Sequence, residues 1–246
     1  MIFIKNKLLI LMFVTYVLPL GGIGISAIGN IHTINHPEND IEGRVSLSVK
    51  SDNLQYGANW FIYLDIPLSD FSVEYSRESK VQWLSSELNW EEQFGEDYTE
   101  APGGTATISG DIPTNIKSQY FTLRKEIVGL SIPFLAKAAL HLGGGYNVHN
   151  SLIPNIDILE DLFNVSNPEG VYSELASDWD LGINDLGDIW DQHSKESNGV
   201  HIQASIQGSI LMLNLFANAK YTFILEDNDS KIESFPGVSI GIAYGI

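Results

Sequence analysis

Two shortages narrow the range of proteins that this chain can be. The 246 residues include no cysteine, which excludes disulfides, thiolate metal sites, a cysteine nucleophile and a lipidated N-terminal cysteine. Basic residues are few, 13 against 31 acidic ones, and the formal net charge is −18. A chain so acidic has no basic stripe to neutralise phosphates, so nucleic acid is not expected as a partner. Its 44% of hydrophobic residues is also too high for a disordered acidic chain.

The N-terminus has the pattern of an export signal. Lys5 and Lys7 precede an apolar run over residues 8–20, and a charged region followed by an apolar one is typical of signal peptides. A membrane-spanning helix is the alternative, because about 20 apolar residues cross a bilayer. Pro19 and the glycines after it disfavour a continuous helix there. We therefore expect a cleaved signal.

The expected product of this cleavage is a single domain. A small residue precedes the cleavage site of a signal peptide, and both Gly22 and Ala27 meet that requirement. The sequence thus predicts a signal peptide over residues 1–22, with the cut between 22 and 27, and one domain over residues 23–246.

Beyond the signal, apolar and polar residues alternate over long stretches. Near the C-terminus, Val238, Ile240 and Ile242 alternate with Ser239 and Gly241. A period of two indicates β-strands, whereas a helix repeats every 3.6 residues. The same pattern predicts eight strands, at residues 22–33, 55–66, 69–78, 118–128, 134–147, 199–208, 211–225 and 236–246.

Three features favour a membrane barrel over a soluble β-sandwich, which alternates in the same way. The predicted strands run to about 10 to 14 residues, which suits a tilted membrane crossing. Their polar faces carry Gly, Ser, Asn and Gln together with charges, as a barrel lumen does. Aromatic residues lie near the strand ends, where an interfacial girdle is expected; they are Trp60, Tyr75, Tyr120, Tyr146, Tyr221 and Tyr244.

The lengths of the connections indicate the topology. Short connections at 67–69, 129–133 and 209–210 alternate with longer ones, as the periplasmic turns and outer loops of outer-membrane barrels do. Counting 45–49 and 81–83 as further membrane strands would place long loops on the periplasmic side, so we interpret both as hairpin extensions above the membrane. The prediction is an all-β, antiparallel, up-and-down transmembrane barrel of eight strands. A ten-stranded barrel is the alternative.

The last predicted strand also carries a motif. Ser239, Gly241, Tyr244 and Ile246 have the spacing of the C-terminal signal by which outer-membrane barrels are recognised for insertion. On this motif and the strand pattern, residues 22–246 resemble the small bacterial outer-membrane barrels of the OmpA, OmpX and OmpW type. Ile246 departs from that family, which usually ends in Phe or Trp. The resemblance implies signal-dependent export to the bacterial outer membrane, with outer-membrane lipid, periplasmic chaperones and the barrel-assembly machinery as partners.

The longest connection, residues 148–198, holds 11 acidic residues against one base, Lys195. Carboxylates at alternating positions suit Ca²⁺ or Mg²⁺, although the spacing is not that of an EF-hand. A solvated acidic face is the other interpretation. Apolar residues at helical spacing also predict short helices over 153–164 and 168–177. The candidate metal ligands are Asp178, Asp180, Asp185 and Asp188, and no other cofactor is expected.

One pair of residues suggests hydrolytic chemistry. His149 and Ser151 have the His-x-Ser spacing of the lipid A deacylases, which are barrels similar to this one, and a nucleophile with a base is the minimum set for acyl transfer. No third member can be assigned, so catalysis is not expected.

Other polar residues are expected to fill the lumen. An eight-stranded barrel has an interior just wide enough for side chains, so a wide pore is not expected. Opposite charges there stabilise one another, since each alone would be costly to bury. The candidates for this network are Arg124, Glu126, Lys137, His141, His201 and Lys220, together with Asp65 and Glu74.

These observations predict a non-enzymatic outer-membrane protein with a structural, surface-interaction or small-solute role. A deacylase-like enzyme that modifies lipid A is one alternative. A secreted, soluble β-sandwich that acts as a binding module is the other.

Overall fold

The chain folds into ten antiparallel strands. The computed structural model describes residues 21–31, 34–41, 45–51, 54–92, 104–132, 136–151, 194–225 and 233–245. Across these ranges there is no helix long and apolar enough to cross a bilayer. The strands are β1 (Gly21–Ile31), β2 (Ile34–Ile41), β3 (Val45–Ser51), β4 (Leu54–Asp65), β5 (Phe71–Glu92), β6 (Gly104–Ile132), β7 (Ala136–Ser151), β8 (Lys195–Ile210), β9 (Leu213–Ile224) and β10 (Phe235–Gly245).

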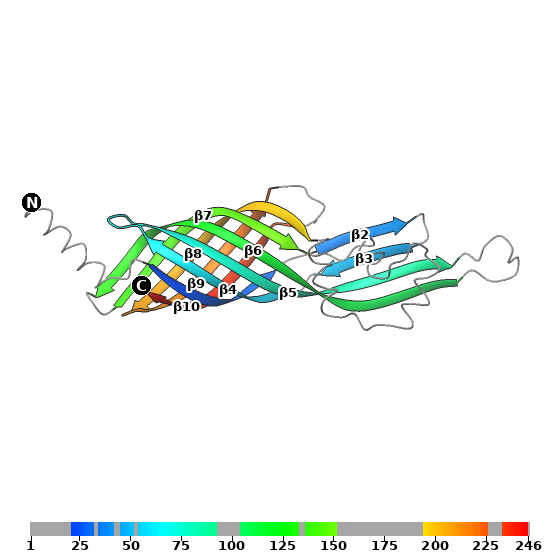
Figure 1. The fold of residues 1–246 in the computed structure, drawn as a ribbon, viewed down its shortest axis with the longest axis horizontal. Helices are drawn as coiled ribbons and strands as arrows, with labels where there is room; N and C mark the ends of the chain where they lie inside the picture. Colours follow the sequence, from blue (N-terminus) through cyan, green and yellow to red (C-terminus); the bar gives the residue numbers. More distant parts are fainter. Residues whose placement is uncertain are drawn as a thin grey trace, which may run out of the picture.

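Eight of these strands close into a barrel (Figure 1). Its order is β1-β4-β5-β6-β7-β8-β9-β10, and β10 pairs with β1 to complete the ring. The predicted antiparallel barrel of eight strands is therefore confirmed. The ten-stranded alternative is wrong, because β2 pairs with β3, and β3 pairs with residues 85–90 of β5, beyond the ring. Neither of the segments 45–49 and 81–83 adds a strand to the ring: the first lies in β3, and the second continues β5 from Val81, the last residue of β5 that pairs with β4.

The register of the ring fixes the tilt of the strands. A row of paired residues, followed once around the barrel, leaves β10 at Gly245 and returns to it at Phe235, ten residues away. A shift of this kind requires strands tilted by about 35–45° to the barrel axis. Residues that pair across strands thus lie at different depths. The intermediate members of this row are Gly22, Tyr63, Glu74, Thr122, Gly145, His201 and Thr222.

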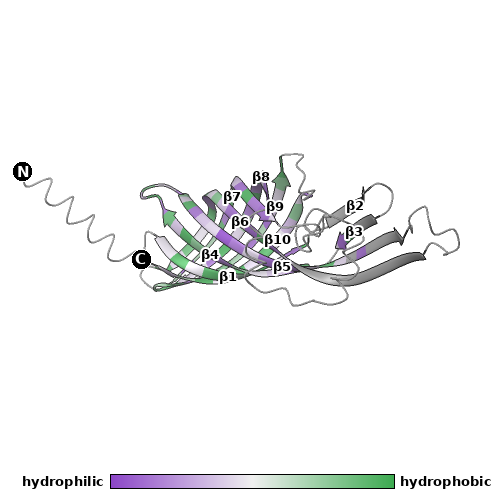
Figure 2. Ribbon diagram, turned by 45° about the vertical axis from the view of Figure 1, so that its right-hand side comes forward, coloured by the Kyte–Doolittle hydropathy of each residue, from purple (hydrophilic) through white to green (hydrophobic). Residues whose placement is uncertain are grey.

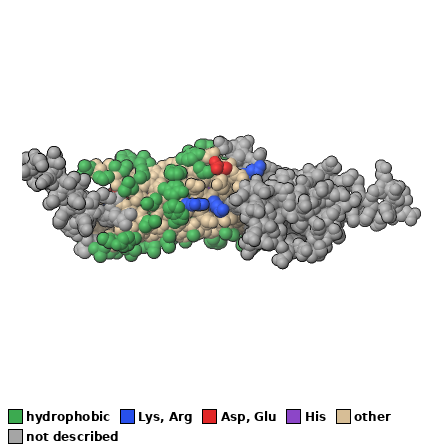
Figure 3. Space-filling model, in the orientation of Figure 1, with side chains coloured by type: hydrophobic (Ala, Val, Ile, Leu, Met, Phe, Trp, Pro, Cys, Tyr) green, Lys and Arg blue, Asp and Glu red, His purple; other side chains and the backbone are tan. Residues whose placement is uncertain are grey.

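The two faces of the wall differ in polarity, as alternation predicts. Large apolar side chains point outward and are exposed, among them Ile25, Ile202 and Ile240. Polar side chains such as Arg124 and His201 point inward and are buried. Figure 2 shows the resulting alternation along the strands, and Figure 3 shows apolar side chains over the described outer wall. An outward apolar face with a polar interior is the arrangement of a transmembrane barrel.

Inward glycines make room for aromatic rings in the lumen. A Cβ atom on Gly24 would lie 2.5 Å from Cζ of Phe61. Phe61 packs edge-on against Phe216, which also meets Tyr63, with ring centroids 5.2 and 5.4 Å apart. These three rings form an apolar cluster with Ala243 inside the barrel, and a larger residue at Gly24 would displace the ring of Phe61.

The structure corrects the prediction at one turn. The turn between β8 and β9 is Leu211–Met212, two residues later than the predicted 209–210. Leu211 adopts a φ of 54°, a left-handed conformation that closes a two-residue hairpin. Ser209 Oγ also donates a hydrogen bond to the side chain of Asn214 across the turn. The turn itself contains no glycine or asparagine, so it has no local sequence signal.

Strands β5 and β6 are also longer than predicted, at 71–92 and 104–132 instead of 69–78 and 118–128. Their distal parts pair with each other and extend past the barrel, where β3 and β2 join them (Figure 1). We call these distal parts, with β2 and β3, the ribbon.

The predicted signal peptide falls almost wholly outside the described residues, which begin at Gly21 within β1. A cut after Gly22 leaves nine of the eleven residues of β1 in place. A cut after Ala27 would remove most of the strand that closes the barrel.

Candidate functional site

Arg124 lies at the centre of a layer of side chains that fills the lumen nearer the short turns. Its guanidinium forms an ion pair with Glu74 at 2.9 Å, and its Nε donates a hydrogen bond to Ser72 Oγ at 3.1 Å. The guanidinium carbon also lies 5.5 Å from the ring centroid of Tyr63 and 5.8 Å from that of Phe216. The arginine has no exposed surface, so its charge depends on Glu74 and the two rings for stabilisation.

A second charged layer lies further along the lumen and is built on Glu78. This carboxylate is 1% exposed and forms ion pairs with Lys80, at 3.2 Å, and with Lys220. Glu78 is on β5 and Lys220 on β9, which are not neighbours in the ring, so their ion pair crosses the lumen. Lys220 Nζ lies 3.6 Å from the ring centroid of Tyr120, and Lys80 Nζ lies 5.0 Å from that of Phe235. The layer therefore ties opposite walls of the barrel together.

Two histidines pack beside this layer. Nε2 of His201 lies 2.9 Å from the hydroxyl of Thr122, and Nδ1 of His149 lies 2.7 Å from the hydroxyl of Ser118. Both imidazoles meet the ring of Tyr120 edge-on, with centroids 5.1 and 5.5 Å away. Together these side chains fill the lumen at the level of Lys220.

The remaining predicted lumen residues meet at the mouth nearest the short turns. The carboxylate of Glu126 forms an ion pair with Lys137 at 2.5 Å, and Nε2 of His141 lies 4.0 Å from the same carboxylate. Lys137 is 45% exposed there. The structure thus divides the six predicted residues into three separate groups along the lumen axis.

The sequence analysis missed Glu78 and Lys80 as members of the network. Both lie at or beyond the predicted end of the strand at residue 78. The alternation that places Glu74 inward continues through Ser76, Glu78, Lys80 and Gln82, all of which are buried. Following this alternation would have found both residues.

The two candidate catalytic residues face the lumen. His149 and Ser151 are fully buried on the inner side of β7. The imidazole Nδ1 is engaged with Ser118, on β6. Acyl chains in the bilayer would contact the opposite face of this strand, so the pair has no access to them.

Residues 152–193 of the predicted acidic loop lie outside the described residues, and with them Asp178, Asp180, Asp185, Asp188 and both predicted helices, whereas the two ends of the loop belong to β7 and β8. Within the described ranges, no group of three or more His, Asp or Glu side chains could hold a metal ion. The site at the four aspartates stays a prediction.

The predicted insertion motif lies on the strand that closes the ring. Ser239 and Gly241 face inward, and Tyr244 faces outward. The Tyr244 hydroxyl lies 2.9 Å from Sδ of Met212 in the β8–β9 turn, at the end of the barrel where an aromatic girdle is expected. Ile246 lies outside the described residues.

These features define the class of the protein: a small transmembrane β-barrel whose lumen is filled by side chains. No family model matches the sequence, and no curated protein matches it either.

The solved structures that are similar to the chain at low identity include the following three. Ail, the attachment invasion locus protein of Yersinia pestis, in complex with the heparin analogue sucrose octasulfate, is 12% identical over 92% of this chain and 97% of its own, with a TM-score of 0.41. Neisserial surface protein A is 8% identical with the same coverage and a TM-score of 0.44. The β-domain of the Bordetella autotransporter BrkA is 9% identical over 92% of this chain and all of its own, with a TM-score of 0.24. The assignment of the barrel rests on the strand pairing and apolar outer wall of this chain.

Proposed function

We propose that this chain is a non-enzymatic protein of the bacterial outer membrane, in which the barrel anchors a β-ribbon for contacts at the cell surface. The observation that carries the proposal is the continuity of β5 and β6 from the barrel wall into the ribbon. Paired backbones that run unbroken through both parts transmit the orientation of the barrel to the ribbon. A barrel with a structural role alone would not need such an extension.

The orientation of the ribbon follows from the connections. The five-residue connection 66–70 and the two-residue turn 211–212 lie at the end of the barrel where β10 finishes, opposite the ribbon. Short turns of outer-membrane barrels lie on the periplasmic side. The ribbon is thus on the outer side. Export would use the predicted signal peptide, and a cut near Gly22 is the one that preserves β1.

Fractionation tests the proposed location. We expect the protein in the sarkosyl-insoluble outer-membrane fraction, and we expect unheated samples to migrate differently from boiled ones on a gel, because a closed barrel resists detergent until it is heated. Boiled protein is the unfolded control. Recovery as a periplasmic monomer without detergent, with no shift on boiling, would instead favour the soluble β-sandwich.

The filled lumen supports a role other than diffusion. Purified protein in planar bilayers is expected to show no stable single-channel conductance, because Arg124, Glu78, Lys220 and the rings around them occupy the lumen. A 16-stranded porin, which leaves an aqueous channel, is the positive control. Regular conductance steps from the folded protein would contradict the surface-contact proposal and favour a small-solute role.

A further inference from the structure

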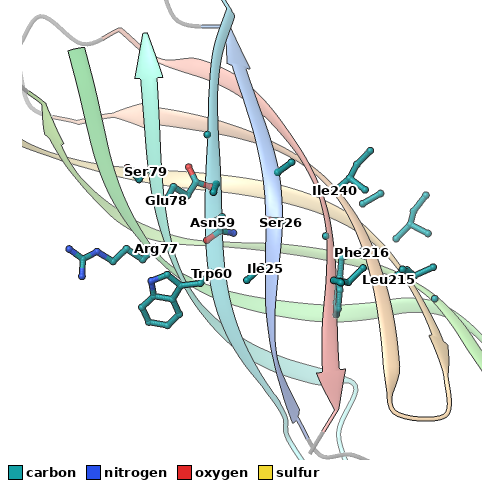
Figure 4. A pocket seen from close by; sticks show the side chains of 18 of the residues that line it. Ile25, Ser26, Asn59, Trp60, Arg77, Glu78, Ser79, Leu215, Phe216 and Ile240 are labelled. Carbon is teal, nitrogen blue, oxygen red and sulfur yellow. The ribbon is translucent and has the colours of Figure 1, made fainter. Parts of the chain in front are cut away.

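One face of the ribbon is apolar and continues the inner side of the barrel wall. In β5, Arg77 is outside and Glu78 inside, and Figure 4 shows their side chains pointing to opposite sides of the strand. The same alternation, carried into the ribbon, places Leu84 on the inner side, where it has no exposed surface. The register then places these residues on one face: Leu84, Leu88 and Trp90 of β5, Val45, Leu47 and Val49 of β3, and Ala106, Ile108 and Ile112 of β6.

The opposite face of the ribbon is polar. Glu87 lies on it, exposed, and pairs with Ser48 of β3 on one side and Ser109 of β6 on the other. A sheet with one apolar and one polar face is half of a two-layer structure, because the apolar face is stable only against a second layer. The other residues that these three strands place on the polar face are Ser85, Asn89, Glu91, Ser46, Lys50, Thr105, Thr107 and Asp111.

The burial of two residues shows that the apolar face is covered. Leu84 is 0% and Val49 1% exposed, although neighbouring strands flank a side chain in a sheet without covering its end. The ten described strands all belong to one sheet. The strand after β6 in the ring, β7, ends at Ser151 opposite Ile116, whereas Leu84 pairs further along β6. The covering layer therefore belongs to a connection between strands.

One connection on the ribbon side is long enough to supply this layer. Residues 152–194 join β7 to β8, and every other connection at that end has eleven residues or fewer. This connection leaves β7 at Ser151, which is fully buried and pairs with Ile116, where β6 enters the ribbon. It thus starts at the base of the apolar face.

The beginning of this connection has the sequence of an amphipathic helix. Over residues 153–164, Leu159 and Phe163 recur at helical spacing, and Asp157 and Asp161 fall on the other side of the predicted helix. One face of such a helix is apolar and the other is acidic. The apolar face suits the inner face of the ribbon, and the acidic face suits water.

The dimensions of the two surfaces also agree. A helix of about 12 residues is about 18 Å long and about 10 Å wide. The strand from Leu84 to Trp90 rises about 20 Å, and three neighbouring strands span about 10 Å between the outer two. One helix laid along β5 would therefore cover the apolar positions of β3, β5 and β6.

We propose that residues 153–164 of this chain pack as an amphipathic helix on the apolar face of the ribbon, with Leu159 against Leu88. A second copy in the same membrane does not fit this position. The apolar face continues the inner side of its own barrel, so a neighbouring barrel meets the polar face instead. The proposal concerns packing within one chain and is independent of what the ribbon contacts at the cell surface.

Disulfide cross-linking tests the proposal in a chain that has no cysteine of its own. In the detergent-folded protein with Leu88→Cys and Leu159→Cys, oxidation is expected to link most molecules internally. Two controls move one cysteine to the other side of its element: Glu87→Cys with Leu159→Cys, and Leu88→Cys with Asp161→Cys. We expect at least fivefold less linkage in each control. Heat-modifiable migration verifies the folding of each variant.

Two results would overturn the proposal. Equal linkage in the test pair and both controls would show that the segment has no fixed position on the ribbon. A cross-linked dimer of the single variant Leu88→Cys would identify a second copy as the occupant. Neither result bears on the proposed location, which fractionation tests separately.

The reactivity of single cysteines tests whether this segment is what buries the face. Leu84→Cys is expected to react with a water-soluble maleimide at least tenfold more slowly than Ser85→Cys, its exposed neighbour. Adding Leu159→Asp and Phe163→Asp should raise the rate at Leu84→Cys at least fivefold and leave the rate at Ser85→Cys unchanged. If the rate at Leu84→Cys stays the same, another segment covers the face and the proposal is wrong.

Discussion

Replacing Glu78 by alanine is expected to lower the free energy of unfolding by about 3–5 kcal/mol, the cost of breaking a buried ion pair. The change leaves the ammonium groups of Lys80 and Lys220 close together inside the lumen without the carboxylate that both contact. It also removes the link between β5 and β9. Urea titration in detergent micelles, followed by tryptophan fluorescence and by heat-modifiable migration, measures this loss.

Asp70→Ala is the matched control, because this carboxylate is exposed in the β4–β5 connection. Its removal is expected to change stability by no more than about 0.5 kcal/mol. A double-mutant cycle with Lys220→Ala isolates the pair. The loss in free energy of unfolding of the double variant should be smaller than the sum of the losses of the two single variants. Removing both partners leaves one uncompensated charge fewer in the lumen than removing Glu78 alone. Additive losses would show that the two residues do not stabilise one another.

Replacing Ile202 by arginine is expected to cost about 2–4 kcal/mol, whereas Ile210→Arg should cost about 0–1 kcal/mol. The two isoleucines face outward on β8 and are 58% and 62% exposed, so a soluble protein would tolerate both changes equally. In a membrane the depths differ. Ile202 lies within the apolar wall, and Ile210 lies beside the turn at the membrane boundary. The penalty follows the depth at which the charge enters the hydrocarbon.

Folding into lipid vesicles, with urea titration of each variant, measures this difference. The same titration in detergent serves as a control, because a micelle adapts its shape and should reduce the contrast. Equal costs for the two variants in vesicles would mean that the outward face of β8 does not contact lipid.

The sequence by itself determined the faces of the barrel. Because alternation has a period of two, the face of one residue in a strand determines the face of every other residue in that strand. Arg124, His201 and Lys220 were placed inward, and Ile240 and Ile242 outward, on this ground alone. The lengths of the connections then favoured eight strands over ten, because each pair of strands returns the chain to the same side of the membrane.

Only the tertiary structure decided which residues meet. Glu78 and Lys220 are 142 residues apart, and no local pattern relates β5 to β9. Their contact depends on the tilt of the strands and on the ten-residue shift around the ring, which are properties of closure. The lengths of β5 and β6 were likewise set by their pairing with each other, since strand ends depend on the partner more than on propensity.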